Sequence, residues 1–407
     1  MFQCFRSFIR ESSPIHPLSD SGVTVGYSCV KESISDQGES SNIVSKYKNH
    51  IELRSRGSNI PVMPVFDNGL LLEELYQNNA RTVFKKTLNY ENALIKRYEL
   101  YDTYFLRINF SFNNYTNIQY YKIMPEWWKL TSEINQNYFY DTTGTQSTVS
   151  NQIDYEYNIN NFQVNKSTTT DSKGVVIIQK TTYPTDYTST VYNEMKSNNI
   201  IAVPIETITL AGSKVTQAKL TTFESRQLWP DGEVQIGFVP EYVYSFNATN
   251  SPTESTFAKY DGLSPNLASY KEDVHYNFYD LRANPSEIIT NGINTYCYLW
   301  GYNQNHPVAK IENASQAQIA ALNLNMTLIN DSATTDSAMQ AELQKIRTGL
   351  PNAMVTTYTY KPLIGVSTIT DPKGDIITYT YDSFGRLQNV KDKTGNILSE
   401  NEYHYKN

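Results

Sequence analysis

Alternating tyrosine and polar residues predict that much of the chain forms short β-strands. The clearest pattern is Tyr-x-Tyr, because residues i and i+2 of a strand lie on the same face. There a tyrosine ring packs while its hydroxyl reaches water or a partner. The pattern occurs seven times, against about 2.5 expected from 32 Tyr in 407 residues. The pairs are Tyr138/Tyr140, Tyr155/Tyr157, Tyr242/Tyr244, Tyr296/Tyr298, Tyr358/Tyr360, Tyr379/Tyr381 and Tyr403/Tyr405.

A second recurring element, Asp-x-x-Gly, predicts tight turns between these strands. The carboxylate bonds backbone N–H groups two residues on, and Gly supplies the left-handed conformation that reverses the chain. The element occurs five times, against about 0.8 expected by chance. It lies at Asp141/Gly144, Asp171/Gly174, Asp371/Gly374, Asp382/Gly385 and Asp392/Gly395. Near the C-terminus Tyr360 and Tyr381 are 21 residues apart, as are Asp371 and Asp392, so each unit is a strand, a turn, a strand and a turn.

The predicted fold class is mainly β: antiparallel hairpin repeats that form a twisted ribbon or spiral sheet, with a short two-helix insertion. The insertion lies where the composition changes to Ala, Gln and Leu without Tyr. Ser315 and Gln318 form a capping box that opens its first helix. The second helix is predicted to run to about Thr348. Its apolar face consists of Met339, Leu343, Ile346 and Leu350.

We expect four segments along the chain. Residues 1–66 are an irregular lead-in of mixed Ser, Pro and charge, at the boundary of a longer chain. Residues 67–312 hold degenerate β-hairpin repeats, 313–351 the helical insertion, and 352–407 well-matched repeats. In one degenerate copy, His275–Asn303, Asn284-Pro285 replaces the turn glycine.

Charge and composition exclude several classes of protein. The net charge of −7 and the absence of a basic run argue against a nucleic-acid partner, which needs a basic stripe. The sequence contains no run of 18 apolar residues, so it predicts no transmembrane helix. Its first residues do not form a signal peptide. Cys4, Cys29 and Cys297 lie too far apart to imply a zinc site or a disulfide framework.

The C-terminal residues resemble a known repeat. From Tyr379 they read Y-x-Y-D-x-x-G-R-L-x-x-V-x-D-x-x-G-N, which closely resembles the YD repeat of Rhs-type bacterial surface and secreted proteins. The resemblance is strong over about Tyr296–Asn407 and looser back to about Gly69. It implies a β-sheet ribbon that winds into a spiral or shell. The repeat-defining structural residues are Tyr379, Tyr381, Asp382, Gly385, Arg386, Leu387, Asp392, Gly395, Asn396, Tyr403 and Tyr405.

The resemblance also implies a location. In Rhs toxins a core motif with an aspartyl self-cleavage site follows the repeats. Asp371-Pro372-Lys373-Gly374 is similar to part of that core, but it sits at the repeat period and is interpreted as an ordinary turn. We therefore expect the C-terminal part of a larger protein, extracellular or on the outer-membrane surface, exported through a signal that lies outside this chain.

The sequence offers no catalytic motif. It lacks G-x-S-x-G, a P-loop, G-x-G-x-x-G and H-E-x-x-H, and its five His are scattered. Turns with single Asp residues supply too few oxygens for calcium. We therefore predict a protein that is not an enzyme, with no catalytic residues, metal or cofactor.

Trp127 and Trp128 are the best isolated binding candidates, since an exposed aromatic ring stacks on a sugar or on a partner. The leading hypothesis is a non-enzymatic structural and interaction module whose partners include upstream repeats of the same polypeptide. One alternative is a carbohydrate-binding or adhesin module that recognises surface glycans or other surface proteins. The other is part of an Rhs shell that encloses a toxin.

Overall fold

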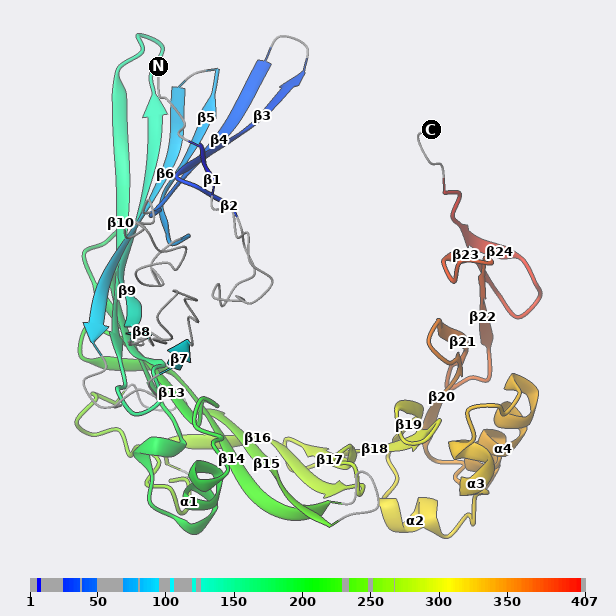
Figure 1. The fold of residues 1–407 in the computed structure, drawn as a ribbon. Coiled ribbons are helices and arrows are strands. Elements are labelled where there is room, and N and C mark those ends of the chain that lie inside the picture. Colours follow the sequence, from blue (N-terminus) through cyan, green and yellow to red (C-terminus); the bar gives the residue numbers. More distant parts are fainter. Residues whose placement is uncertain are drawn as a thin grey trace, which may run out of the picture. The chain divides into compact units, whose positions relative to one another are not determined.

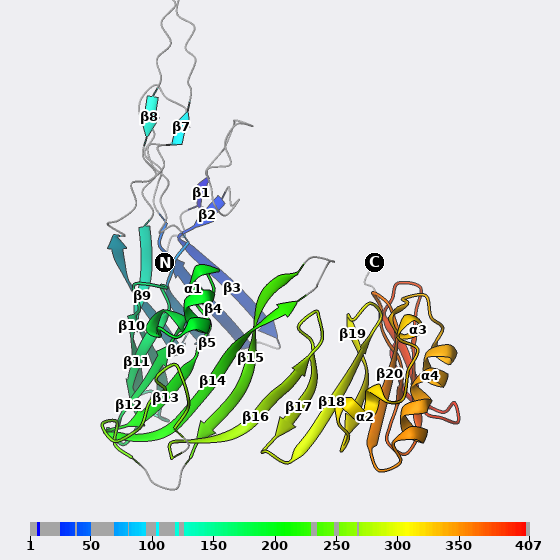
Figure 2. The ribbon, with the colours of Figure 1, turned by 90° about the horizontal axis from the view of Figure 1, so that it is seen from below.

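The chain forms two compact units, Met1–Lys180 and Thr181–Asn407. The computed structural model describes residues 6–8, 25–36, 39–49, 69–79, 81–94, 103–105, 119–121, 126–228, 234–247, 252–266 and 268–403. Figures 1 and 2 show both units as ribbons. Both are mainly β, and each strand pair within them is antiparallel. The predicted fold class is thereby confirmed.

The main strands of the first unit pair in chain order. They are β3 (Cys29–Asp36), β4 (Glu39–Tyr47), β5 (Leu71–Asn78), β6 (Arg81–Leu94), β9 (Glu126–Tyr140), β10 (Gln146–Tyr157), β11 (Val164–Thr170) and β12 (Val176–Thr182). Two further pairs are separate: β1 (Arg6–Phe8) with β2 (Val25–Tyr27), and β7 (Thr103–Phe105) with β8 (Gln119–Tyr121).

Within residues 1–66 the described segments 25–36 and 39–49 are more regular than the irregular lead-in that the sequence predicts. Both β3 and β4 lie in this range and pair with each other along their whole lengths. These strands are rich in Ser, Lys and Glu and therefore lack the apolar alternation by which a strand is predicted. They still pair, because the backbone hydrogen bonds of a ladder do not require an apolar face. The other predicted segment boundaries remain predictions.

Eleven antiparallel ladders join the second unit's strands in chain order from β13 to β24. They are β13 (Glu206–Ala211), β14 (Lys214–Leu228), β15 (Gln235–Phe246), β16 (Tyr270–Tyr279), β17 (Pro285–Thr290), β18 (Asn294–Gly301), β19 (His306–Glu312), β20 (Met354–Lys361), β21 (Gly365–Thr370), β22 (Ile376–Tyr381), β23 (Leu387–Lys391) and β24 (Ile397–Glu400). A 3-10 turn, η1 (Pro184–Asp186), and α1 (Thr190–Ser197) precede β13.

Three helices, not the two predicted, form the insertion: α2 (Gln316–Ala320), α3 (Met326–Asn330) and α4 (Asp336–Gly349). The predicted capping box at Ser315 and Gln318 is present. The sequence pattern misses α3 because it has five residues, too few for a helical period. The side chain of Asn325 caps it by accepting from the Leu328 N–H at 3.1 Å.

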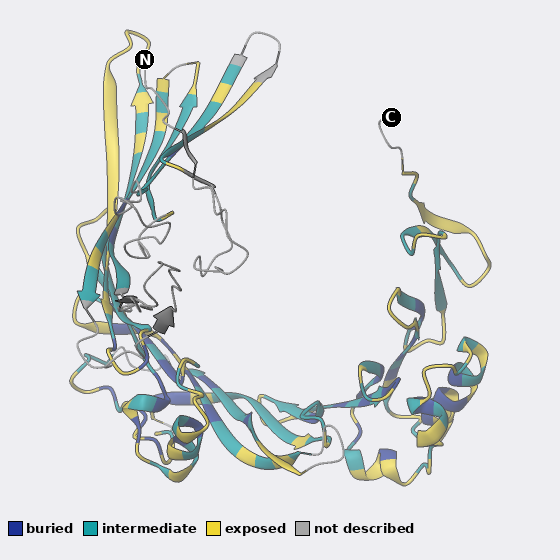
Figure 3. Cartoon of the chain, in the orientation of Figure 1, coloured by how far each residue is buried: buried dark blue, intermediate teal, exposed yellow. Residues whose placement is uncertain are grey.

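The helices cover an apolar core on strands β18 to β20 (Figures 1 and 2). Met339, Leu343 and Ile346 are fully buried, as predicted for one face of α4. They pack against strand residues that alternate inward, among them Cys297 and Val308. In Figure 3 buried residues gather in α4 and in the strands of the second unit, whereas the first half of β10 is exposed on both faces.

Glycine lets α3 approach β18 closely. A Cβ at Gly301 would lie 2.7 Å from both the Ile329 carbonyl oxygen and Val308 Cγ1. The N–H group of Tyr302 then donates to that Ile329 oxygen at 2.8 Å. The end of β18 therefore supplies a hydrogen-bond donor to a carbonyl group at the C-terminus of α3.

Candidate functional site

All five Asp-x-x-Gly turns share one set of hydrogen bonds. In each, the Gly N–H donates to the Asp carbonyl oxygen at 3.0 Å, and the Gly has a φ between 76° and 89°. One carboxylate oxygen, Oδ1, accepts from the backbone N–H groups two and four residues on, at 2.8 to 3.0 Å. The carboxylate thus replaces solvent for two N–H groups that the reversal leaves without strand partners.

A sixth copy of the turn lies at Asp280, where the sequence shows no glycine. Asp280 Oδ1 accepts from the N–H groups of Arg282 and Asn284 at 2.8 and 2.9 Å. The residue in the glycine position is Ala283, whose φ is 65°. The prediction that Asn284-Pro285 replaces the glycine is therefore wrong. An alanine takes the left-handed conformation instead, at a cost of about 1–2 kcal/mol.

Tyrosine hydroxyls meet β-bulges at six places. In each, one strand carries an extra residue relative to the strand before it. A tyrosine from the next strand or segment donates its hydroxyl hydrogen to the carbonyl oxygen of the residue preceding that bulge. The donors and acceptors are Tyr140 and Thr82, Tyr157 and Leu130, Tyr279 and Pro240, Tyr360 and Pro307, Tyr381 and Val366, and Tyr403 and Leu387, at 2.6 to 3.0 Å.

We call this arrangement the tyrosine–bulge bond. A bulge disrupts a ladder locally, so it leaves backbone groups that need another partner. Four of the six donors are the second tyrosine of a Tyr-x-Tyr pair. Tyr140, Tyr279 and Tyr381 each directly precede the Asp of a turn. In the Tyr-Asp dipeptide, the tyrosine therefore supplies the hydrogen bond to a bulge, and the aspartate supplies the hydrogen bonds of a turn.

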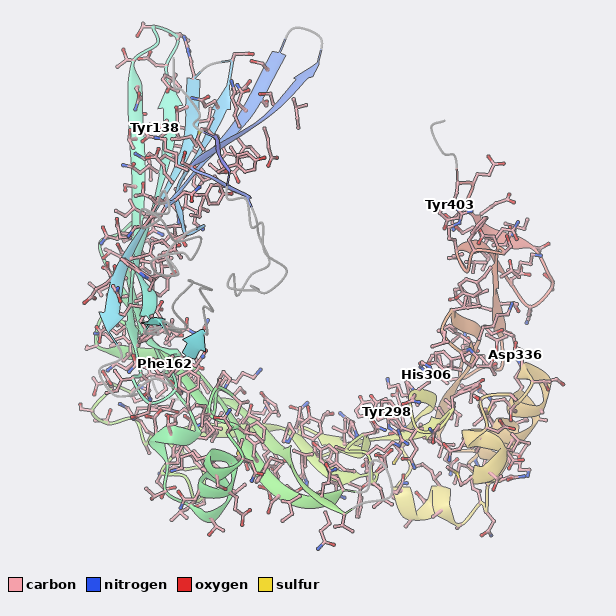
Figure 4. The ribbon with its side chains drawn as sticks, in the orientation of Figure 1. Tyr138, Phe162, Tyr298, His306, Asp336 and Tyr403 are labelled. Atoms are coloured by element: carbon pink, nitrogen blue, oxygen red, sulfur yellow. The ribbon has the colours of Figure 1, made fainter. Side chains whose placement is uncertain are left out.

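The C-terminal repeat adds a cation to this arrangement. Arg386 pairs with Asp382 at 2.6 Å and lies 4.3 Å from the ring centre of Tyr403, which is labelled in Figure 4. The amide of Asn396 donates to Asp392 at 2.9 Å. The Tyr381 hydroxyl approaches the backbone of Gly365 closely. A Cβ atom at Gly365 would lie 2.4 Å from the hydroxyl oxygen, so the close approach depends on glycine.

Most of the remaining repeat-defining residues lie in the same ladders. Tyr379 pairs with Val390, and Leu387 with Tyr381. Gly385 and Gly395 are the turn glycines. Tyr405 lies outside the described residues.

Hydrogen bonds to two of the turn carboxylates favour their ionised forms. Bonds from the Thr394 hydroxyl and the Asn396 amide lower the pKa of Asp392 to about 2. The bond from Arg386 lowers the pKa of Asp382. These two carboxylates are therefore charged wherever the chain is folded at neutral pH.

Trp127 and Trp128, the predicted binding residues, are both half-buried in β9. The Trp127 ring makes edge contacts with Tyr157 and Phe162 at centroid distances of 5.2 and 5.0 Å. The Trp128 ring lies 3.8 Å from Lys48 Nζ. The structure does not bring the two rings together on one surface, because adjacent strand residues face opposite ways.

A cleft that sequence reasoning missed lies in the second unit, between β14, β15 and the start of α1. Its volume is about 410 Å³. The lining residues are Ser189, Thr190, Val191, Thr222, Phe223, Glu241, Tyr242, Tyr244, Tyr260, Gly262, Leu263 and Pro265. These come from four segments of sequence, so no local motif marks them. The pair Tyr242/Tyr244 is the only signal that the sequence contains.

Buried tyrosines form the wall behind this cleft. Tyr192 donates its hydroxyl hydrogen to the Tyr260 hydroxyl at 3.3 Å. The Tyr270 hydroxyl and the Tyr260 N–H both donate to Glu206, which is 2% exposed. Burial raises the pKa of Glu206 despite these bonds. The two donors satisfy the carboxyl group and hold it in the wall, so Glu206 has a structural role.

The described residues hold no cluster of three or more His, Cys, Asp or Glu side chains placed to bind a metal ion. A search of the same residues for a helix that is both long and apolar enough to cross a membrane finds none.

A comparison with curated protein sequences finds no match. One similar solved structure is TcdB2-TccC3 without its hypervariable C-terminal region, with 10% identity and a TM-score of 0.47 over 90% of this chain and 20% of that chain. Another is the Tc holotoxin pore of Photorhabdus luminescens, with 8% identity and a TM-score of 0.46 over the same shares. This chain spans about a fifth of the length of those chains.

The family match falls on three of the Asp-x-x-Gly turns. Residues 365–397 match the RHS Repeat family. This segment holds the turns at Asp371, Asp382 and Asp392 and the tyrosine–bulge bond of Tyr381. The resemblance of the C-terminal residues to the Rhs-repeat family is thereby confirmed: residues 365–397 are an RHS repeat.

Proposed function

We propose that the chain is a structural and interaction module, the C-terminal YD-repeat part of a large exported cell-surface protein. The single observation that carries this proposal is the repeated use of one turn and one tyrosine–bulge bond. Such repetition is typical of proteins in which each unit stacks on its neighbours to build an extended surface. The RHS repeat at 365–397 supports the same function.

Limited proteolysis with mass spectrometry on the purified chain tests whether the repeats form a stable module. We expect a resistant product that retains most of residues 126–403, because their turns and bulges have satisfied backbone groups. Rapid digestion throughout this range would contradict an autonomous structural role.

Surface exposure needs a test in cells. Brief protease treatment of intact cells of the source bacterium, followed by detection with an antibody against the chain, is expected to remove the signal. A cytoplasmic marker serves as the control. Signal that survives until the cells are lysed would contradict the surface location.

Glycan binding through Trp127 and Trp128 remains a prediction. A glycan array with the wild-type chain and the variants Trp127→Ala and Trp128→Ala tests it. Binding that is absent, or that both variants retain, would count against it.

The third hypothesis, a wall that encloses a toxin, also remains a prediction. Coexpression of the chain with the protein's upstream repeats and with products of adjacent genes tests it. A toxin that copurifies and resists added protease would support enclosure, whereas a fully digestible one would oppose it.

A further inference from the structure

One of the six bulges contains a carboxylate. The residues that directly follow the six bulge acceptors are Val83, Thr131, Glu241, Val308, Ser367 and Gln388, of which only Glu241 carries a charge. Bulges redirect side chains out of the regular alternation of a strand. The bulge in β15 places Glu241 in the wall of the cleft, directly after Pro240, whose carbonyl accepts from Tyr279.

No described cation forms an ion pair with Glu241, although His275 and Arg226 lie near enough for their charges to lower its pKa. The structure records no ion pair for it among the described residues, and its only hydrogen bond there is a long one, 3.5 Å, from the Thr222 hydroxyl. Arg226 is engaged elsewhere, because it pairs with Glu224 and donates to the Asn277 carbonyl. His275 stacks flat on Tyr242 with the ring centres 4.2 Å apart. A partly buried carboxylate without a counter-ion carries an energetic cost that a cationic ligand would remove.

The rest of the cleft suits a ligand with an apolar body. Phe223, Leu263 and Pro265 supply apolar surface, and Tyr244 and Tyr260 supply aromatic side chains. The cleft wall also holds an unused polar atom: the Ser189 hydroxyl oxygen is buried and has no hydrogen-bond partner among the described residues. Buried polar atoms without partners are rare in native proteins and often mark a missing water or ligand.

We propose that this cleft binds an organic ammonium ion, with Glu241 as its counter-ion. The alkyl part lies against the apolar wall, and the ammonium group lies beside Glu241 and Thr222. The N-terminus of α1 carries a positive partial charge, so the cation avoids that side of the cleft. This binding site is independent of the structural function proposed above.

Electrostatics across the cleft support this choice of ligand. Burial, followed by the charge of Glu224, raises the pKa of Glu241. In turn, the charge of Glu241 adds to burial in raising the pKa values of Tyr242 and Tyr260. The carboxylate of Glu241 therefore disfavours an anionic ligand beside it, whereas a cation there would favour its ionised form.

Titration of the full chain at pH 8 tests the proposal. The probes are choline, n-butylammonium, a short lysine peptide with blocked termini, and 3,3-dimethylbutan-1-ol, which is the neutral isostere of choline. Isothermal calorimetry or saturation-transfer NMR measures each affinity. We expect at least one cation to bind about tenfold more tightly than the neutral isostere.

The probes separate the sources of the cation. Choline or butylammonium binding without peptide binding identifies a free small molecule, whereas peptide binding identifies a lysine side chain of a partner. Either result supports the proposal. Equal affinity for the neutral alcohol, or no binding of any cation, overturns it, and this comparison requires no variant.

A matched pair of variants locates the site. Glu241→Gln keeps the shape of the side chain and is expected to weaken cation binding about tenfold. Glu194→Gln, which removes a carboxylate from α1 outside the cleft lining, is expected to leave it unchanged. Circular dichroism confirms that both variants fold. Unchanged affinity in a folded Glu241→Gln chain would overturn the assignment of the counter-ion.

Discussion

At the scale of the residue, the two tyrosines of a Tyr-x-Tyr pair have different roles. Tyr381 bonds the Val366 carbonyl at 2.9 Å, whereas no hydrogen bond joins the Tyr379 hydroxyl to the described residues. The two residues share a strand and both are half-buried. Their comparison therefore isolates the tyrosine–bulge bond.

Tyr381→Phe is expected to destabilise the β21–β22 region by about 1 kcal/mol, because it leaves the Val366 carbonyl at a bulge without its partner. Hydrogen exchange of the amides in β21 and β22 measures this local stability. Tyr379→Phe is the control and should leave exchange unchanged. Equal effects of the two substitutions would contradict a specific role for the bond.

Ala283→Gly is expected to stabilise the chain by about 1 kcal/mol, since Gly adopts the left-handed conformation without the penalty that Ala incurs. The midpoint of thermal unfolding measures the change. The reciprocal substitution Gly385→Ala, at a φ of 76° and with ordinary contacts around the new Cβ, should lower the midpoint. A lower midpoint for Ala283→Gly would show that the shared turn geometry is wrong.

The turn carboxylates predict a loss of stability in acid. The folded pKa values of Asp382 and Asp392 lie below the value of about 3.9 for an unfolded Asp, and that of Asp392 is about 2. The stabilisation is fully present above about pH 5 and is lost as the pH falls from about 4 toward 2.

Thermal unfolding between pH 7 and pH 2.5 measures this effect. Asp392→Asn should flatten the acid limb, while Asp154→Asn, an exposed strand residue, should not. An unaltered acid limb in Asp392→Asn would mean that these hydrogen bonds do not contribute.

At the scale of the element, local patterns were predictable and distant pairings were not. The Asp-x-x-Gly turns and the face of α4 follow from residues a few positions apart, so the sequence predicts them directly. The bulges are not predictable in this way, because an extra residue shows only in the register between two strands. At Asp280 the replacement for glycine was assigned wrongly to Asn284-Pro285, because the left-handed position is occupied by an alanine, Ala283.

The cleft was missed for a related reason. Thr222, Glu241 and Tyr260 meet only after β14, β15 and the segment before β16 have assembled. Trp127 and Trp128 were chosen for their residue type, and the structure gives both rings partners within the chain. Residue type alone therefore identified aromatic residues but not a binding surface.

The contact between α3 and β18 gives a prediction about an element. Gly301→Ala should cost about 1–3 kcal/mol, because the added methyl group meets the Ile329 carbonyl and Val308. Chemical denaturation measures the loss. Ser332→Ala, at an exposed position two residues after the end of α3, is the control and should have little effect. A neutral Gly301→Ala would mean that α3 does not rest on the strand.

At the scale of the whole molecule, the tyrosine–bulge bond recurs in both units. Tyr140 and Tyr157 use it in the first unit, and Tyr279, Tyr360, Tyr381 and Tyr403 in the second. Repetition of this kind stabilises a sheet by many small, similar contributions instead of one large core.

Hydrogen exchange with mass spectrometry on the full chain tests this claim most directly. We predict slow exchange in the peptides that contain the six bulges and the Asp turns, in both units, with protection comparable to that of the neighbouring strands. Fast exchange at these peptides while the strands remain protected would contradict the claim, because the bulges and turns would then be open instead of closed by tyrosine and aspartate.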